Sequence, residues 1–228
     1  MGISAGADVV EDGLVFCLDA ASKRSYPGTG TVWTDLAGEN NGTLTNGPTF
    51  SSDNGGIIEF DGSDDYVVTS SNVGITGASP RTLCFWFDYT DSVVKNIVGY
   101  GAGNVNADIF DVLHYYSGGY YRIIGHFYGG GYDTSSTLPS RDTVNFNAWN
   151  YICVSYDSTN VYVYTNGLFS NSITLTLTTV DGVFHIGKGT YSTYDYFTGN
   201  ISNVSIYNRA ITADEVLQNY LATRGRFQ

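Results

Sequence analysis

Short runs of alternating hydrophobic and polar residues extend over most of the chain, and such runs are typical of β-strands. The run Thr82–Phe87 is apolar on both faces, which predicts a strand in the middle of a sheet. The segment 22–56 is rich in Gly, Asn and Pro turn signals and is predicted to be mostly loop. The predicted strands are Leu14–Leu18, Ile57–Phe60, Tyr66–Val68, Thr82–Phe87, Ile109–Tyr116, Tyr120–Tyr128, Tyr151–Tyr156, Val161–Tyr164, Ile173–Leu177, Val183–Ile186 and Ile201–Tyr207.

Two turn signatures organise these strands. The run Val161–Tyr164 alternates β-branched and aromatic residues and leads into Asn166-Gly167, the strongest short-range hairpin signal. The segment from Phe60 to Val67 reads as a strand that ends in a tight, carboxylate-rich turn. Together the two signatures predict an antiparallel β-sandwich that presents loops to a ligand.

One helix is predicted, near the C-terminus. Thr212 and Glu215 have the spacing of a capping box, in which each side chain accepts a hydrogen bond from the other's backbone amide. An apolar stripe at helical spacing follows, formed by Val216, Leu217, Tyr220 and Leu221. We expect this short helix to pack across a sheet end.

Composition and charge narrow the functional classes. The 228 residues are expected to form a single domain, 1–228, with residues 1–12 as an extended N-terminal arm. A net charge of -12 argues against nucleic acid as a partner, because phosphate binding needs a basic surface. No apolar run approaches the roughly 18 residues of a membrane span, so no membrane partner is expected.

The three cysteines, Cys17, Cys84 and Cys153, each lie in an apolar strand-like run. They are interpreted as buried small hydrophobic residues, with one disulfide and a leftover thiol as the alternative. Met1–Asp8 has neither a basic region nor an apolar core, so no signal peptide is recognised. Synthesis in a cytoplasm-like compartment is the resulting expectation.

A series of motifs in a fixed order carries a family resemblance. The chain resembles a laminin-G-like domain of the concanavalin A-like jelly-roll superfamily, which implies an all-β fold of two curved antiparallel sheets. The run Ser25–Leu36 also resembles the jelly-roll proteins of marine bacteriophages. The matching segments are Trp33–Gly38 with Asn40–Gly42, Phe60–Val67, Thr82–Phe87, Trp149–Ile152 leading to Tyr156-Asp157, Val163–Gly167, His185–Gly187, Phe197–Val204 and Ile206–Thr212.

The superfamily includes glucanases, so catalysis has to be weighed. Laminarinase-type relatives place two Glu and one Asp at alternating positions of one strand, which sets the carboxylates on one face. Only Glu59 has an acidic neighbour on the same face, Asp61, and that residue belongs to the family's structural turn. We therefore expect no enzyme activity. His185, in an alternating apolar run, is predicted to be a structural imidazole with its hydrogen bonds satisfied.

Calcium is the expected cofactor. Hard cations take several oxygen ligands, and Asp61, Asp64 and Asp65 are the candidate carboxylates. The backbone carbonyls of Gly199–Ile201 would add ligands if the two regions meet. In the alternative interpretation, Asp61 caps the turn through its own backbone and the other two carboxylates are solvated.

Tyrosines beside glycines form the candidate contact surface. Such rings stack on sugars or anchor protein interfaces, and they also stabilise sheets through cross-strand pairing. All three interpretations stay open at this point. The candidate ligand or interface residues are Tyr115, Tyr116, Tyr120, Tyr121, Tyr128, Tyr132, Tyr194 and Tyr196.

The absence of a recognised signal peptide, set beside a fold that resembles extracellular recognition modules, favours a virus particle. Our first hypothesis is a non-catalytic virion surface protein, a capsid decoration or fibre subunit made in the host cytoplasm. Its partners would be capsid or other virion proteins and cell-surface glycans. A free-standing calcium-dependent carbohydrate-binding module or lectin is the alternative, and a glycoside hydrolase is a minor one. Homo-oligomers are compatible with both leading hypotheses.

Overall fold

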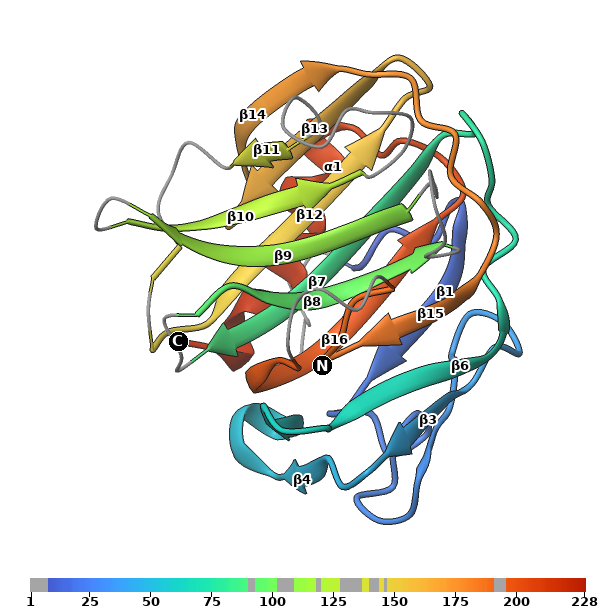
Figure 1. Cartoon of the computed structure of the whole chain (residues 1–228). Coiled ribbons are helices and arrows are strands. Elements are labelled where there is room, and N and C mark those ends of the chain that lie inside the picture. Colours follow the sequence, from blue (N-terminus) through green and yellow to red (C-terminus); the bar gives the residue numbers. More distant parts are fainter. Residues whose placement is uncertain are drawn as a thin grey trace, which may run out of the picture.

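The computed structural model describes residues 8–89, 93–101, 109–117, 120–127, 137–139, 144–145, 147–190 and 196–228. These residues form two antiparallel sheets, a front sheet and a back sheet, packed face to face (Figure 1). The back sheet has the order β14-β13-β12-β7-β16-β5-β4, with β1 also paired to β16. The front sheet has the order β11-β10-β9-β8-β15-β6-β3-β2. The expected all-β jelly-roll sandwich is confirmed.

The strand bounds are as follows. The back sheet contains β1 (Leu14–Asp19), β4 (Thr49–Ser51), β5 (Ile57–Asp61), β7 (Arg81–Tyr89), β12 (Asn150–Tyr156), β13 (Asn160–Thr165), β14 (Leu168–Thr174) and β16 (Thr198–Tyr207). The front sheet contains β2 (Val32–Trp33), β3 (Gly42–Thr45), β6 (Tyr66–Asn72), β8 (Lys95–Gly101), β9 (Ile109–Ser117), β10 (Tyr120–His126), β11 (Thr137–Pro139) and β15 (Val183–Ile186).

The predicted central strand is confirmed, because β7 pairs with β12 on one side and β16 on the other. The prediction of a strand over Ile173–Leu177 was wrong. Asn166 and Gly167, with φ of 52° and 81°, reverse the chain tightly, so β14 begins at the next residue and ends at Thr174. The strand β8 was not predicted at all.

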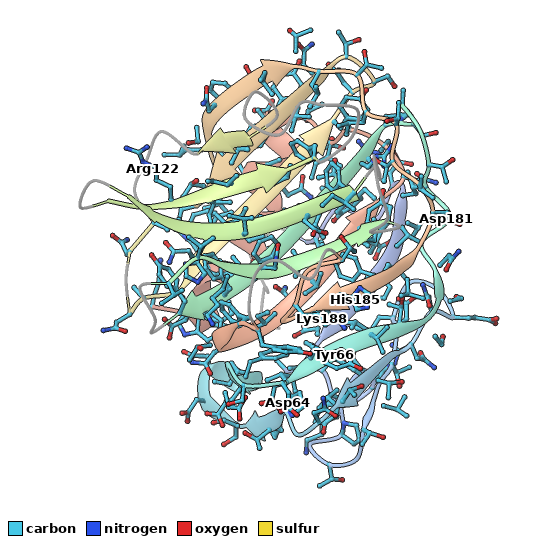
Figure 2. All side chains as sticks on the ribbon, viewed as in Figure 1. Asp64, Tyr66, Arg122, Asp181, His185 and Lys188 are labelled. Carbon is cyan, nitrogen blue, oxygen red and sulfur yellow. The ribbon has the colours of Figure 1, made fainter. Side chains whose placement is uncertain are left out.

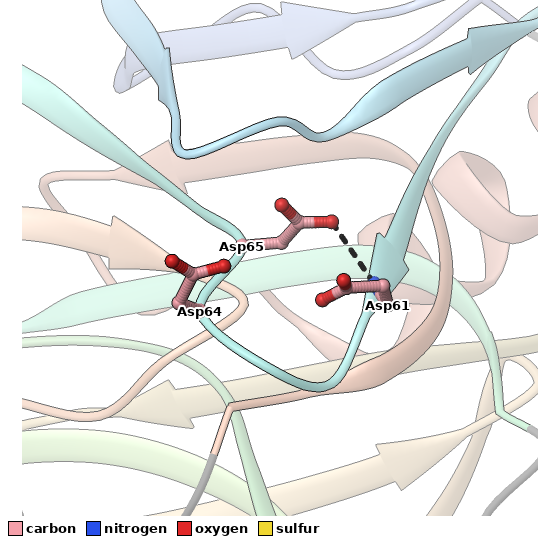
Figure 3. Close-up of side chains that lie close together, drawn as sticks. All are labelled: Asp61, Asp64 and Asp65. Atoms are coloured by element: carbon pink, nitrogen blue, oxygen red, sulfur yellow. Dashed lines mark hydrogen bonds between the residues drawn. The ribbon is translucent and has the colours of Figure 1, made fainter.

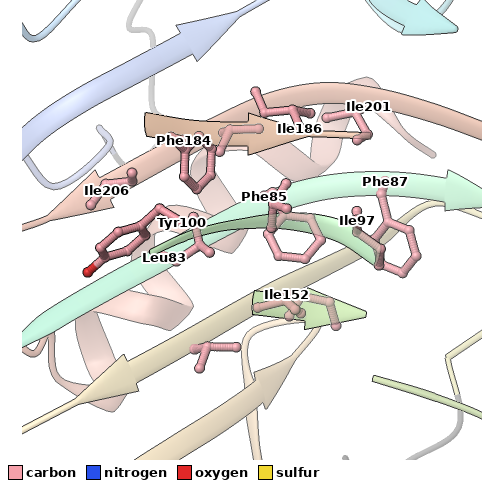
Figure 4. Packing of buried hydrophobic residues seen from close by; sticks show 14 of the residues in the cluster. Leu83, Phe85, Phe87, Ile97, Tyr100, Ile152, Phe184, Ile186, Ile201 and Ile206 are labelled. Carbon is pink, nitrogen blue, oxygen red and sulfur yellow. The ribbon is translucent and has the colours of Figure 1, made fainter. Parts of the chain in front are cut away.

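The main core lies between the two sheets. Phe85 and Phe87 of β7 point toward the front sheet, and Phe184 of β15 and Tyr100 of β8 point back (Figure 4). All four side chains are at most 1% exposed. Burial of each such side chain stabilises the fold by roughly 1.5–3 kcal/mol. The strands of both sheets supply this stabilisation because every second side chain along them is apolar and points into the core.

The helix α1 (Ala213–Thr223) covers the outer face of the back sheet. The Trp86 ring stacks on Tyr220 with centroids 5.6 Å apart, and its indole N–H donates to Thr223 Oγ1 over 2.8 Å. The predicted capping box between Thr212 and Glu215 is confirmed. The expectation of packing across a sheet end was wrong, since the outward Trp86 and Tyr151 rings offer an apolar surface on the sheet face.

Two short 3-10 helices complete the fold, η1 (Asp53–Gly55) and η2 (Arg224–Arg226). Within the part of the chain that the structure describes, no helix has the length and apolar character needed to cross a bilayer. Cys84 and Cys153 are buried, Cys17 is half-buried, and all three are free thiols. Burial raises the pKa of Cys17 to about 11, as expected of a cysteine that acts as a small hydrophobic residue.

Candidate functional site

The acidic turn, Asp61 to Asp65, connects β5 of the back sheet to β6 of the front sheet. Gly62 has a φ of 80°, which a residue with a side chain rarely adopts. The Asp61 carboxylate accepts a hydrogen bond from the Ser63 amide over 2.8 Å. The Asp65 carboxylate accepts one from the Asp61 amide over 3.0 Å (Figure 3). These two bonds fix the direction of both carboxylates.

The three predicted carboxylates of the turn do come together. Asp61, Asp64 and Asp65 each offer one oxygen, and these oxygens lie within 4.8 Å of one another. Asp61 caps the turn and Asp64 is exposed, as the alternative interpretation required, but Asp65 is only 5% exposed and is not solvated. Its burial, followed by the charges of Asp61 and Asp64, raises the pKa of Asp65.

The donor set of the acidic turn fits a hard divalent cation. Three carboxylates at this spacing supply oxygen ligands and three negative charges. The segment Gly199–Ile201, whose backbone carbonyls are the other candidate ligands, also meets the turn. Asp61 pairs with Thr198, and Phe60 pairs with Gly199. A cation would relieve the mutual repulsion of the three carboxylates.

A second group of side chains adjoins the turn on the outer face of the front sheet. We call it the Tyr66 platform: Tyr66, His185, Lys188 and Tyr196, all half-buried (Figure 2). The Tyr66 ring lies 6.3 Å from the rings of both His185 and Tyr196. The Lys188 Nζ atom lies 4.2 Å from the centre of the Tyr66 ring, a cation–π contact. The platform therefore combines aromatic faces with a cation.

His185 does not have the satisfied hydrogen bonds that its sequence context predicted. Its Nδ1 atom is buried and has no partner among the described residues. Burial, with a smaller contribution from the charge of Lys188, lowers the pKa of His185 to about 4. The imidazole is therefore neutral near pH 7.

The segment from Gly187 to Thr190 carries Lys188 and is anchored on both sides. The Gly187 amide donates to the Ile97 carbonyl over 2.7 Å. Thr190 donates to the buried Asp111 carboxylate, from its hydroxyl over 2.8 Å and from its amide over 3.2 Å. Burial raises the pKa of Asp111 to about 7. The backbone under Lys188 is therefore held against the sheet.

The predicted tyrosines are only partly placed. Tyr196 joins the Tyr66 platform. The β9–β10 register pairs Tyr116 with Tyr121 in the backbone, as cross-strand pairing requires. The side chains of Tyr115, Tyr116, Tyr120 and Tyr121, and the whole of Tyr128, Tyr132 and Tyr194, lie outside the described residues.

Sequence reasoning missed Tyr66, His185 and Lys188 as site residues. Tyr66 had been assigned only to a strand, although it directly follows the acidic turn. Lys188 stands between two glycines at the end of a strand, which is a signal for a cation on an exposed loop. The alternation of β15 also placed His185 on the outer face, since its neighbours Phe184 and Ile186 are core residues.

A cavity of about 300 Å³ lies on the opposite side, between α1 and the back sheet. Part of its polar wall is bonded within the protein: Asn219 Nδ2 donates to the Tyr207 hydroxyl over 3.0 Å, and that hydroxyl donates to the Val10 carbonyl. The Asn219 side-chain oxygen, Oδ1, accepts from the Val10 amide. The polar groups of Asn219 and Tyr207 are thus satisfied within the protein.

The glutamates do not form a catalytic pair within the described structure. Glu59 and Asp61 share the exposed face of β5, and Glu59 accepts a hydrogen bond from Thr49 over 2.9 Å. Glu215 serves the helix cap and pairs with Arg209 over 2.6 Å. Glu11 and Glu39 are exposed outside any strand.

Comparison with known proteins agrees with this fold. The family model described as the concanavalin A-like lectin/glucanases superfamily, Laminin_G_3, matches residues 61–217. No curated protein sequence matches the chain significantly.

Several solved structures share the fold at low sequence identity. Domain 4 of AbnA, an extracellular GH43 arabinanase from Geobacillus stearothermophilus solved with arabinotriose, is 16% identical with a TM-score of 0.69; the match covers 92% of this chain and 100% of that one. The Trypanosoma rangeli sialidase is 15% identical with a TM-score of 0.68, over 94% of this chain and 33% of its own. The binding domain of Paraclostridial mosquitocidal protein 1 is 15% identical with a TM-score of 0.64, over 92% and 52%. The chain thus spans about a third of the sialidase.

Proposed function

The chain belongs to the concanavalin A-like lectin/glucanase superfamily, and from this premise we propose that it is a non-catalytic carbohydrate-binding domain. Its sugar site is the Tyr66 platform together with the acidic turn. The observation that carries the proposal is the contact of half-buried aromatic rings with free polar groups on one open sheet face. The arabinanase domain, solved with arabinotriose, covers the same fold over its whole length and supports this reading.

The platform has the parts that sugar recognition needs. Aromatic rings provide a flat apolar surface for the C–H face of a pyranose or furanose ring. Polar groups at the edge then bond the hydroxyls, and Lys188 and the neighbouring Thr45 are placed for this role. Thr45 is paired with Tyr66 and therefore projects from the same face.

Calcium at the acidic turn is part of the proposal. Asp61, Asp64 and Asp65 would hold the ion, and the ion would supply a charge that sugar hydroxyls can bind. Its binding would also stiffen the start of β6, where Tyr66 stands. The protein's own ligands would not fill every coordination position of the calcium ion, so water or sugar oxygens would take the remaining positions.

We propose that the domain catalyses no reaction. Retaining glycosidases need two carboxyl groups about 5–5.5 Å apart across the sugar, one of them protonated. The three carboxylates of the proposed site lie together on the acidic turn, where we assign them to the cation and not to an acid and a nucleophile on either side of the sugar, and Glu59 lies on the back sheet. A Glu59→Gln variant should bind sugar like the parent protein.

The test is a glycan array followed by calorimetry, with calcium and again with a chelator. Tyr66→Ala should lower the affinity for any bound glycan at least tenfold, because it removes the stacking surface. Tyr162→Ala is the matched control, since that half-buried tyrosine lies on the back sheet, where its hydroxyl donates to Asp157. Loss of binding in both variants, or in neither, would contradict this placement of the site. No binding to any glycan would contradict the function itself.

We also propose that this binding domain is displayed on a virion, as a capsid decoration or fibre subunit that contacts other virion proteins. The support is the resemblance of Ser25–Leu36 to marine bacteriophage jelly-roll proteins. In the structure Ser25, Tyr26 and Trp33 of this run are buried and hold the fold, so the resemblance concerns the scaffold. Quantitative mass spectrometry of purified particles tests the proposal, and absence of the chain from them would end it.

A further inference from the structure

Within the described residues, Lys188 is a cation that forms no ion pair, in a protein with a net charge of -12. The ion pairs of this part of the chain join Arg209 and Arg226 to carboxylates. Its side chain is half-buried against the Tyr66 ring. A half-buried ammonium group loses hydration and gains only a ring face in return. Such an arrangement leaves its remaining donors for a ligand.

We propose that the Tyr66 platform selects glycans that carry a carboxylate, such as uronic acids, and that Lys188 pairs with this carboxylate. The inference rests on the proposed function, because it names the class of sugar bound at the same site. Stacking on Tyr66 would place the sugar ring beside the Lys188 ammonium group. A charge-assisted hydrogen bond to the carboxylate would then complete the contact.

The position of Lys188 is set by the backbone, not by chance contacts of a long side chain. The Gly187 amide donates to Ile97, and the Gly187 carbonyl accepts from the Phe197 amide over 2.8 Å. Two residues later, Thr190 is bound to Asp111. Because the backbone around Lys188 is held on both sides, binding has to order only its side chain, which favours a specific contact.

His185 lies beside the same ring, with the two ring centroids 6.3 Å apart, and its imidazole is neutral near pH 7 because burial lowers its pKa to about 4. The positive charge beside the Tyr66 ring is therefore that of Lys188. A single ammonium group matches a single carboxylate. A sulfated chain needs a broad basic patch instead, and the acidic turn beside the platform works against one.

The acidic turn affects the same ligand. Its three carboxylates would repel an anionic sugar, but Asp65 is turned toward the Asp61 amide and a bound calcium ion would cancel most of the charge. Calcium and a carboxylated sugar should therefore bind cooperatively. A neutral sugar should gain less from calcium than its carboxylated partner.

The experiment compares ligand pairs that differ only in charge, on the array and then by calorimetry. Oligogalacturonates and their methyl esters form one pair, 3′-sialyllactose and lactose another, and a sulfated lactose is added. We expect the protein to bind a carboxylated member about tenfold more tightly than its neutral partner. In Lys188→Gln this preference should fall to near one, because the affinity for the carboxylated sugar falls by more than the affinity for the neutral sugar, which loses only a hydroxyl contact.

Lys23→Gln is the matched control, since Lys23 is exposed in a loop outside the site, and it should keep the full preference. Thermal unfolding of both variants checks that each is folded. Binding of neutral sugars only, an undiminished preference in Lys188→Gln, or binding of sulfated but not carboxylated glycans would overturn the inference and leave the proposed function standing. Silence toward every glycan would overturn both.

Discussion

The buried Asp111 carboxylate predicts a measurable pH dependence of stability. Asp111 lies on β9 opposite Gly99, where an added Cβ would come 1.9 Å from its carboxylate oxygen. Thr190 donates hydrogen bonds to it from both its hydroxyl and its amide. These bonds do not fully replace water, so burial raises the pKa from 3.8 to about 7.

The sign follows from proton binding. Between pH 3.8 and about pH 7 the folded state keeps the Asp111 proton that the unfolded state has lost. The Asp111 contribution is therefore complete below pH 3.8 and is lost as the pH rises toward 7. At 1.36 kcal/mol for each pH unit, the total over this interval is about 4 kcal/mol.

The assay is urea unfolding of the parent protein and of Asp111→Asn at pH 4, 5, 6, 7 and 8. The free energy of unfolding of the variant, relative to the parent, should rise by about 4 kcal/mol from pH 4 to pH 8. Groups common to both proteins cancel in this difference. Parallel curves for the two proteins would refute the reasoning, because they would show that Asp111 titrates alike in both states.

Two further predictions concern the frame of the site. Gly187→Ala should lower the free energy of unfolding by about 2 kcal/mol or more, because Gly187 has a φ of 84° and an added Cβ would lie 2.6 Å from the Phe60 ring; an unchanged urea midpoint would contradict this. Bonds from Arg209, then from Thr212, lower the pKa of Glu215 to about 2, so its contribution is present above pH 4.5 and lost toward pH 2. Glu215→Gln should therefore cost about 1 kcal/mol at pH 7 but little at pH 2, and an equal cost at both would count against it.

The acidic turn could be predicted from sequence because its chemistry is local. Asp61, Gly62 and Asp65 lie within five residues, and a turn of that length brings their side chains together whatever the rest of the chain does. The helix cap formed by Thr212 and Glu215 is local in the same sense. Strand alternation likewise identified β7, since both faces of a central strand are covered.

The Tyr66 platform could not be predicted in this way. Tyr66 and Lys188 are 122 positions apart in the chain (188 − 66) and meet only because β15 pairs with β6 in the front sheet. That pairing is a property of the topology, which periodicity does not determine. The strand β14 was misplaced for a different reason: its exposed Leu168 and Phe169 do not alternate with polar residues.

The two sheets differ in how their outer faces are covered. The back sheet places Trp86, Tyr151 and Cys153 on its outer face, and α1 with the segment before β1 covers them. This cover packs the aromatic rings of the sheet against side chains of the protein itself, and the stacking of Trp86 on Tyr220 is the main example. On the front sheet the rings of the Tyr66 platform stay half-exposed, and the Lys188 ammonium group forms no ion pair among the described residues. The site proposed there therefore combines aromatic rings with a cation, which is what a polar ligand with a flat apolar side requires.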